Sequence, residues 1–349
     1  MSDFYSLTID KISRLTPNSV AVSFVIPEEL ENKFAFEAGQ YITIKHKVDG
    51  EEVRRAYSIS SSPKDKQITI GIKKVPEGRF STYANTSLQE GDQLLVMPPE
   101  GRFVYKTSNK KGNICAFASG SGITPIMSIA RTVLESHPEN TFVLVYGNQN
   151  KSEAMFHNEI LELANTYKDR FTVQFVYSRA REEDSLFGRI DTSVINFILK
   201  NKFKEIHFNT FYLCGPEAMI NLSCDTLKAN GIAEDSIYFE LFTTSENEES
   251  ETVNLEGKTT VEVLLDDEVY SFSMDKKSSV LDAVLDEDID APYSCQGGVC
   301  STCIARITEG EAKMDKNQIL TDSEISEGLI LTCQAHPVTA TLKIDYDDV

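Results

Sequence analysis

Two cysteine-rich stretches near the C-terminus decide the fold of the last part of the chain: PYSCQGGVCSTCIARI at residues 292–307 and LILTCQAHP at residues 329–337. They contain four of the seven cysteines, namely Cys295, Cys300, Cys303 and Cys333. A close pair of cysteines also occurs in structural zinc sites, and disulfides are a further alternative. Zinc sites, however, usually combine two close pairs, whereas here three cysteines form one group and the fourth stands alone. This C-x4-C-x2-C…C spacing is typical of a [2Fe–2S] cluster.

The two glycines between the first two cysteines fit the same cofactor. A cluster with bridging sulfides is negatively charged, so main-chain N–H groups must turn toward its sulfur atoms. Gly297 and Gly298 allow the loop to bend that closely, because they carry no side chain. We therefore predict that the four cysteines are cluster ligands.

The residues around the cysteines predict the elements of one small domain. Residues 259–274 alternate apolar and polar side chains in two runs, which indicates a hairpin. A helix is expected near residues 280–287, with Ser278 or Ser279 as its N-cap, and a last strand at residues 340–346. This segment, residues 259–349, resembles the plant-type ferredoxin domain, which has an α+β (β-grasp) fold. The resemblance implies a one-electron carrier.

Composition and charge narrow the class of protein. The chain has 349 residues, enough for two or three domains, and no run of about 18 apolar residues. Without a recognisable signal peptide, its cysteines are expected to be thiols and ligands, and we expect a cytoplasmic protein that is not membrane-bound. A net charge of −20 argues against nucleic acid as a partner.

The acidic residues are unevenly distributed. Residues 259–349 contain 19 acidic and 6 basic residues, and residues 244–258 form an acidic, polar stretch that we interpret as a linker. The charge serves solubility, or it guides the carrier to a basic surface of an electron-accepting protein, and the sequence leaves both interpretations open.

Residues 1–105 contain many short β-like runs divided by turns, which indicates an antiparallel β-barrel. Within them, RRAYSISSSP at residues 54–63 places Arg55, Tyr57 and Ser58 along one strand, and we expect all three to face one side. Arginine can pair with a phosphate, tyrosine can pack on a ring and serine can bond to its edge.

A turn and a helix start follow in VPEGRFSTYA at residues 75–84. Gly78 and Ser81 lie where free N–H groups at a helix start suit a pyrophosphate. A simple N-cap by Ser81 is the alternative.

Residues 106–243 alternate apolar strands with helical periods, as in a parallel, doubly wound α/β sheet. After the first strand, ASGSGITP at residues 118–125 places Gly120, Gly122 and Thr124 where the main chain can approach a phosphate at a helix start. Nucleotides bind at the carboxyl ends of the strands in such sheets.

Two later strand ends belong to the same edge of the predicted sheet. Ser178 and Arg179 end one strand, and an arginine there suits the 2′-phosphate of NADPH, although a surface arginine is the alternative. Cys214, just before a Gly-Pro pair, is either a small buried side chain or a neighbour of a nicotinamide.

RAYS, EGRFS, GSGITP, YLCGP and FELFT, in this order, resemble the ferredoxin–NADP reductase superfamily, and the order of modules resembles reductases that supply oxygenases. The resemblance implies FAD-binding (residues 1–105), NAD(P)-binding (106–243) and ferredoxin (259–349) domains. It also implies roles for individual residues: flavin binding by Arg55, Tyr57, Ser58, Gly78 and Ser81, phosphate binding of NAD(P)H by Gly120, Gly122 and Thr124, and places beside the reacting rings for Cys214, Glu240 and Phe242. Lys73 is a further expected cofactor-binding residue, as are Ser178 and Arg179 at their strand end.

The implied function is an NAD(P)H-dependent oxidoreductase that passes electrons from NAD(P)H to FAD, to the [2Fe–2S] cluster and then to an oxygenase-type acceptor. A flavin accepts two electrons together and releases them singly, which suits this order. The alternatives are a ferredoxin-like carrier or sensor without turnover, and a reductase for another acceptor such as a desaturase.

Overall fold

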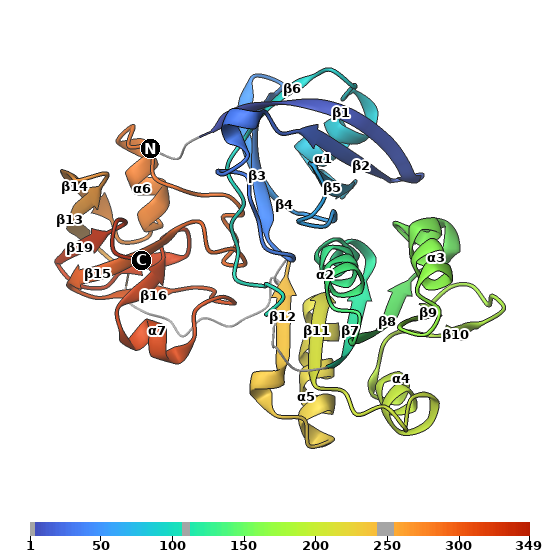
Figure 1. Ribbon diagram of the computed structural model, residues 1–349. Coiled ribbons are helices and arrows are strands. Elements are labelled where there is room, and N and C mark those ends of the chain that lie inside the picture. Colours follow the sequence, from blue (N-terminus) through green and yellow to red (C-terminus); the bar gives the residue numbers. More distant parts are fainter. Residues whose placement is uncertain (1–3, 107–111, 243–254) are drawn as a thin grey trace. The chain divides into compact units, whose positions relative to one another are not determined.

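The computed structural model describes residues 4–106, 112–242 and 255–349 (Figure 1). These residues form two compact units. The larger unit holds the described part of residues 5–242 apart from residues 54–56, and the smaller one holds the C-terminal part of the chain. The predicted linker at residues 244–258 lies mostly outside the described residues.

The N-terminal half of the larger unit is an antiparallel sheet with the strand order β4-β3-β6-β1-β2-β5. An isolated bridge between Ile59 and Ile70 joins its two edge strands, which confirms the predicted barrel. Because side chains alternate along each strand, one set of apolar residues fills the interior, including Leu7, Val22 and Phe24. The strands are β1 (Tyr5–Thr16), β2 (Ser19–Val25), β3 (Tyr41–Val48), β4 (Glu51–Ser58), β5 (Gln67–Lys73) and β6 (Gln93–Val96).

Short helices complete the barrel. They are the 3-10 turn η1 (Glu28–Leu30) and the helix α1 (Arg79–Thr86). Helix α1 contributes Phe80 and Ala84 to the barrel core, four residues apart and therefore on one face.

The second half of the larger unit is a parallel sheet with the order β10-β9-β8-β7-β11-β12, which confirms the doubly wound fold. The chain proceeds from β7 through β8 to β9 on one side and from β11 to β12 on the other, so the topological switch point lies between β7 and β11. The strands are β7 (Asn113–Ser119), β8 (Thr141–Asn148), β9 (Phe171–Tyr177), β10 (Ser185–Phe187), β11 (Thr210–Gly215) and β12 (Ile237–Leu241).

The helices of this sheet follow its strands, as Figure 1 shows for α2 after β7 and α5 after β11. Helix α3 begins only at His157, because Phe156 before it is in the left-handed conformation, with a φ of 57°. Residues 151–153 form a separate 3-10 turn. The helices and turns are η2 (Gly120–Gly122), α2 (Ile123–Ser136), η3 (Lys151–Glu153), α3 (His157–Thr166), α4 (Thr192–Phe197), the π-helical η4 (Ile198–Lys202), α5 (Glu217–Ala229) and η5 (Glu234–Ser236).

The smaller unit contains a mixed sheet with the order β14-β13-β19-β15-β17 and a two-stranded sheet of β16 and β18. The predicted hairpin is confirmed, with Asp266 and Asp267 at positive φ in its turn. The predicted cap is also confirmed, because Ser279 Oγ accepts a hydrogen bond from the N–H of Asp282. The elements are β13 (Lys258–Leu265), β14 (Glu268–Asp275), α6 (Val280–Asp286), β15 (Ile304–Glu309), β16 (Ala312–Met314), α7 (Asp322–Ser326), β17 (Leu329–Leu331), β18 (Ala335–Pro337) and β19 (Thr341–Asp345).

Candidate functional site

The four predicted cluster ligands come together in the smaller unit as two pairs. The Sγ atoms of Cys303 and Cys333 are 3.3 Å apart, although the two residues are far apart in the sequence. The thiols of Cys295 and Cys300 are hydrogen-bonded to each other. A [2Fe–2S] cluster has two irons, and two thiolates on each satisfy its four protein ligands.

In each pair, hydrogen bonds favour the charged form of one thiol, Cys295 or Cys333, as an iron ligand requires. The same pairing and burial raise the pKa of the other thiol, Cys300 or Cys303. The hydrogen bond from Cys300 and the N–H groups of Gly297, Val299 and Cys300 lower the pKa of Cys295 to about 6, although burial acts in the opposite direction. The hydrogen bond from Cys303 likewise lowers the pKa of Cys333, with help from the N–H of Gly298. The loop therefore presents N–H donors to sulfur, as a negatively charged cluster needs.

The backbone of the cysteine loop explains one of its glycines. Gly298 has a φ of +73°, and a Cβ there would lie 2.9 Å from the carbonyl oxygen of Lys316. Gln296, at a φ of 54°, adopts the same left-handed conformation with a side chain. The structure thus requires glycine at position 298, whereas at Gly297 a Cβ would meet only the carbonyl oxygen of Cys295 at 3.8 Å.

Sequence reasoning missed Gln334, which connects the two cysteine stretches. Its Nε2 donates to the carbonyl of Gln296 at 2.9 Å and to that of Cys333 at 3.0 Å. Its place directly after a ligand cysteine was the one available signal.

On the strand β4, the expectation that Arg55, Tyr57 and Ser58 face one side is wrong for Ser58. Neighbouring residues of a strand point to opposite faces. Tyr57 packs against Phe80 of the barrel, with ring centroids 5.8 Å apart. Ser58 is buried and its Oγ donates to Glu240 Oε2 at 3.3 Å, so it contacts the strand β12 of the parallel sheet.

The predicted pyrophosphate turn is tightly built. Gly78 occupies the N-cap position of α1, so Ser81 lies inside the first turn and is not the N-cap. The hydroxyl of Ser81 donates to the carbonyl of Gly78 at 3.2 Å and accepts from the N–H of Val75 at 3.3 Å. Gly78 has no side chain that could cap α1, so the first N–H groups of this helix are suited to an anion.

The loop between β7 and α2 brings three predicted residues together. Gly120 has a φ of +56°, and a Cβ there would lie 3.7 Å from Lys73 Nζ, so a lysine from the barrel points at this loop. The hydroxyl of Tyr146 donates to the carbonyl of Gly120 at 3.0 Å, and that of Thr124 donates to the carbonyl of Ser121 at 2.9 Å. A cation beside a glycine turn at a helix start is suited to a phosphate.

Gly122 serves a purpose different from the one that the sequence suggested. Its φ of −60° is available to any residue, but a Cβ there would overlap the carbonyl of Cys214. It would also lie 2.8 Å from the amide nitrogen of Gly215. Gly122 is therefore required where the turn η2 meets the end of β11, at the topological switch point.

Cys214 and Glu240 are opposite each other in the register of β11 and β12. Both are buried, with 0% and 9% of their surface exposed. Burial raises the pKa of Glu240 to about 8, although the hydrogen bond from Ser58 acts in the opposite direction. Burial and the charge of Glu240 raise the pKa of Cys214, so a neutral thiol and a largely neutral carboxyl lie side by side at pH 7. Phe242, just beyond β12, is half-buried and packs on the core of this unit.

Ser178 and Arg179 follow β9, as predicted. Their N–H groups donate to the carbonyls of Asn148 and Gln149 at 3.0 and 2.8 Å. The side chain of Arg179 is exposed, and within residues 4–106, 112–242 and 255–349 no ion pair occupies its guanidinium. Nearby, Arg181 lies 4.5 Å from the ring centre of Phe187, an aromatic side chain that is 54% exposed and that sequence reasoning missed.

Comparisons with known proteins divide the chain in the same order. Family models match for the oxidoreductase FAD-binding domain at residues 6–105, the oxidoreductase NAD-binding domain at residues 117–225 and the 2Fe-2S iron-sulfur cluster binding domain at residues 263–338. The protein is therefore an oxidoreductase of the flavin- and iron–sulfur-containing class, and its cofactors are FAD, a [2Fe–2S] cluster and NAD(P)H.

Relatives extend over the whole chain. It is 35% identical to one of the subunits of 1,2-phenylacetyl-CoA epoxidase from Escherichia coli (strain K12), over 99% of both chains. It is 30% identical to the ferredoxin reductase component of 3-ketosteroid-9-alpha-monooxygenase from Mycolicibacterium smegmatis, over 99% of this chain and 98% of the relative. The chain belongs to this family of reductase components, which supply electrons to oxygenases.

Solved structures show the same fold. Phthalate dioxygenase reductase matches with a TM-score of 0.63 and 22% identity over 98% of both chains. An intact type IV self-sufficient cytochrome P450 monooxygenase matches with a TM-score of 0.70 and 19% identity, over 98% of this chain and 41% of that one. In the part of the chain that the structure describes, no helix is long and apolar enough to cross a membrane.

Proposed function

We propose that this protein carries electrons from NADPH through FAD and a [2Fe–2S] cluster to the oxygenase component of a phenylacetyl-CoA epoxidase. The observation that supports this choice of electron acceptor is the 35% identity to one chain of that enzyme over 99% of both sequences. The similarity to ketosteroid monooxygenase reductases makes a steroid oxygenase the second candidate.

For the cluster, we propose Cys295 and Cys300 as ligands of one iron and Cys303 and Cys333 as ligands of the other. The two thiol pairs and the N–H donors around them support this assignment. For the flavin, we propose Arg55, Tyr57 and Ser58 on β4 and Gly78 and Ser81 at the start of α1 (residues 79–86). When bound, FAD accepts two electrons from NADPH together and passes them on singly.

For the nucleotide, we propose that Lys73, Gly120 and Thr124 bind the phosphates, while Gly122 lets their turn approach the end of β11. The nearness of Lys73 Nζ to Gly120 supports this role, because the amine places a full positive charge beside the turn, where it can pair with a phosphate. Cys214, Glu240 and Phe242 would border the reacting rings. The protonated Glu240 carboxyl and the neutral Cys214 thiol would exclude water there without placing a negative charge beside the flavin.

We propose NADPH as the preferred donor because Arg179 has an exposed guanidinium at the end of β9, beside Ser178. An arginine is the side chain best suited to a 2′-phosphate. Phe187, with one face against Arg181, offers a flat apolar surface for the adenine ring.

We also propose that the chain divides into an FAD domain (1–105), a nucleotide domain (106–243), a linker (244–258) and a ferredoxin domain (259–349). None of the seven cysteines, all of which lie in the described part of the chain, forms a disulfide, which favours the reducing cytoplasm as the location of the protein. The acidic surface of residues 259–349 favours a basic docking surface on the acceptor.

Reconstitution tests the proposed acceptor. The purified protein, with flavin and iron quantified, is mixed with NADPH and with the oxygenase component of either phenylacetyl-CoA epoxidase or a 3-ketosteroid 9α-monooxygenase. Product formation with the epoxidase component alone supports the proposal. Product formation with the steroid monooxygenase component alone would show that the acceptor is a steroid oxygenase instead. If NADPH does not reduce the flavin, as judged by its absorbance, a carrier or sensor without turnover is favoured instead.

A further inference from the structure

Helix α2 is the element that connects the two halves of the larger unit. Its N-terminus adjoins the turn Gly120–Gly122, which we assign to the nucleotide phosphates, and the helix continues to Ser136. Most of its length is buried, including every residue from Ile123 to Ala130. A displacement of this helix would therefore move the phosphate turn with it.

One face of α2 contacts the barrel at three points along its length. At its start, Thr124 packs on Gly71 of β5, where a Cβ would lie 2.7 Å from Thr124 Cγ2. One turn later, Ser128 Oγ donates to the carbonyl of Ser61 at 2.7 Å, and Ser128 is completely buried. Near its end, Glu135 Oε2 accepts from Ser62 Oγ at 2.7 Å. Positions 124, 128 and 135 are four and then seven residues apart, which places them on one side of a helix.

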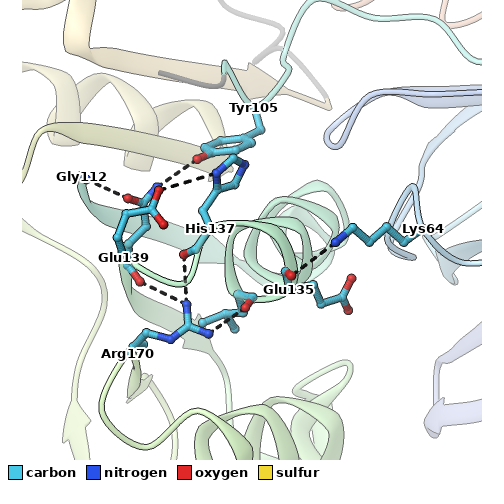
Figure 2. A network of polar contacts seen from close by, with 9 residues as sticks. Lys64, Tyr105, Gly112, Glu135, His137, Glu139 and Arg170 are labelled. Carbon is cyan, nitrogen blue, oxygen red and sulfur yellow. Dashed lines mark hydrogen bonds and ion pairs between the residues drawn. The ribbon is translucent and has the colours of Figure 1, made fainter. Parts of the chain in front are cut away.

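The barrel segment on the other side of these contacts is itself fixed. Ser61 and Ser62 follow three and four residues after Ser58, which lies at the end of the flavin strand β4. Ser61 Oγ accepts from the N–H of Thr69 at 3.0 Å, so β5 holds this segment. Figure 2 shows a further contact, in which Lys64 Nζ donates to the carbonyl of Glu135 at 3.3 Å.

The C-terminal end of α2 is held equally firmly by its own sheet. Arg170 donates to the carbonyl of Leu134 at 2.7 Å. It also donates to the carbonyl of His137 at 3.1 Å, as Figure 2 shows. Lys64 and Arg170 thus place two positive charges on the last carbonyls of the helix, where they also favour its dipole. The helix is held at this end by the barrel and by the nucleotide sheet at once.

We propose that Ser128 and Glu135 are positioning residues for hydride transfer, because they fix α2, and with it the phosphate turn, in register with the flavin strand β4. The inference rests on the proposed function. Hydride transfer moves a proton and two electrons together from the nicotinamide ring to the flavin ring. The two rings must therefore be in contact. A misplacement of about 1 Å costs such a reaction up to about 100-fold in rate.

The test compares four variants of the full-length protein: Ser128→Ala, Glu135→Ala, Glu135→Gln and Thr132→Ala. Thr132 is the matched control, because it lies on the same helix and its hydroxyl donates to the carbonyl of Ser128 within that helix. Glu135→Gln keeps an oxygen that can accept from Ser62 and should rescue the function that Glu135→Ala loses.

Stopped-flow flavin reduction at saturating NADPH, with a deuterated nucleotide for comparison, measures the chemical step. We expect flavin reduction to be slower by roughly tenfold or more in Ser128→Ala, and by a smaller factor in Glu135→Ala. The primary isotope effect should be larger in both variants, and the dissociation constant for FAD should be unchanged. The equilibrium absorbance that NADP⁺ induces on the reduced flavin should weaken in parallel. In protein freed of FAD, the main-chain amides of residues 59–64 should exchange hydrogen faster in Ser128→Ala than in the unaltered protein. In Thr132→Ala their exchange should be unchanged.

Rates and absorbance in Ser128→Ala and Glu135→Ala that equal those of the unaltered protein would overturn the inference. An equal loss in Thr132→Ala would do the same, since it would show a general effect of helix stability. If the unaltered protein is not reduced by NADPH at all, the proposed function fails. Reduction of the unaltered protein together with unaffected variants refutes the positioning role alone.

Discussion

The carbonyl of Cys214 occupies the space that a Cβ at Gly122 would need. The two residues belong to the turn after β7 and to the end of β11, and they meet at the switch point of the parallel sheet. This contact sets how closely the proposed phosphate turn approaches the strand end that carries the buried thiol.

Gly122→Ala should therefore impair nucleotide binding although its backbone conformation suits alanine. The added methyl group must displace main chain, which typically costs about 1–3 kcal/mol. We expect a lower melting temperature and a higher KM for NADPH in reduction of ferricyanide. Ser136→Ala, at the opposite end of α2, removes an atom far from this turn and should change neither value. Identical behaviour of the two variants would contradict the role of this contact.

Cys300→Ser should abolish the visible absorbance of the cluster and leave NADPH reduction of the flavin intact. The cysteine lies in the smaller unit, which has a hydrophobic core of its own. Iron analysis and stopped-flow absorbance measure the two effects, and Cys224→Ser, on α5, is the control. Stoichiometric zinc in place of iron in the unaltered protein would reject the cluster.

The sequence predicted the three modules, and it singled out the proposed cluster ligands, because these signals are local. The spacing of Cys295, Cys300 and Cys303 and the alternation of short strands depend on neighbouring residues alone. It could not predict that Gly122 accommodates β11 or that Ser58 bonds to Glu240, because these contacts join residues far apart in the chain. The same holds for Tyr146, whose hydroxyl reaches Gly120 only in the folded sheet.

Arg179→Ala should raise the KM for NADPH at least about tenfold and leave that for NADH nearly unchanged. A charge-assisted hydrogen bond contributes about 1.5–3 kcal/mol, and only NADPH carries the 2′-phosphate. NADH serves as the internal control within each preparation. Equal kinetics of the unaltered protein with both nucleotides would reject the assignment of Arg179.

Glu240 should make the larger unit less stable as the pH rises. Burial raises the pKa of this carboxyl from 4.5 to about 8 in the folded protein, so between these values the folded state holds a proton that the unfolded state has lost. The free energy of unfolding then falls with rising pH, by up to about 1.4 kcal/mol per pH unit from this group.

Glu240→Gln should remove that part of the pH dependence, because the amide does not ionise. Melting temperatures at pH 5.5, 6.5 and 7.5, followed by flavin release, would show a shallower decline in the variant. Asp235→Asn, an exposed acid in the turn η5 just before β12, should leave the decline unchanged. A variant as pH-sensitive as the unaltered protein would mean that Glu240 is ionised in the fold.

Gln334→Leu should weaken the hold of the protein on its cluster without removing a ligand. The amide of Gln334 joins the carbonyl of Gln296, in the first cysteine stretch, to that of Cys333 in the second. Leucine has nearly the same volume but no donor, so Gln296, already in a left-handed conformation, loses the contact that holds its carbonyl. We expect a faster loss of visible absorbance in the presence of an iron chelator and a changed circular dichroism spectrum of the cluster.

Gln318→Leu is the matched control for this change. Gln318 lies beside the same loop, but its contact there is made by the main chain, whose N–H donates to the carbonyl of Gly298 at 3.1 Å. The same substitution should therefore leave the rate of cluster loss close to that of the unaltered protein. If both variants lose the cluster equally fast, general loosening of the loop explains the effect, and the specific bridge from Gln334 does not. If neither does, the bridge contributes nothing to cluster retention.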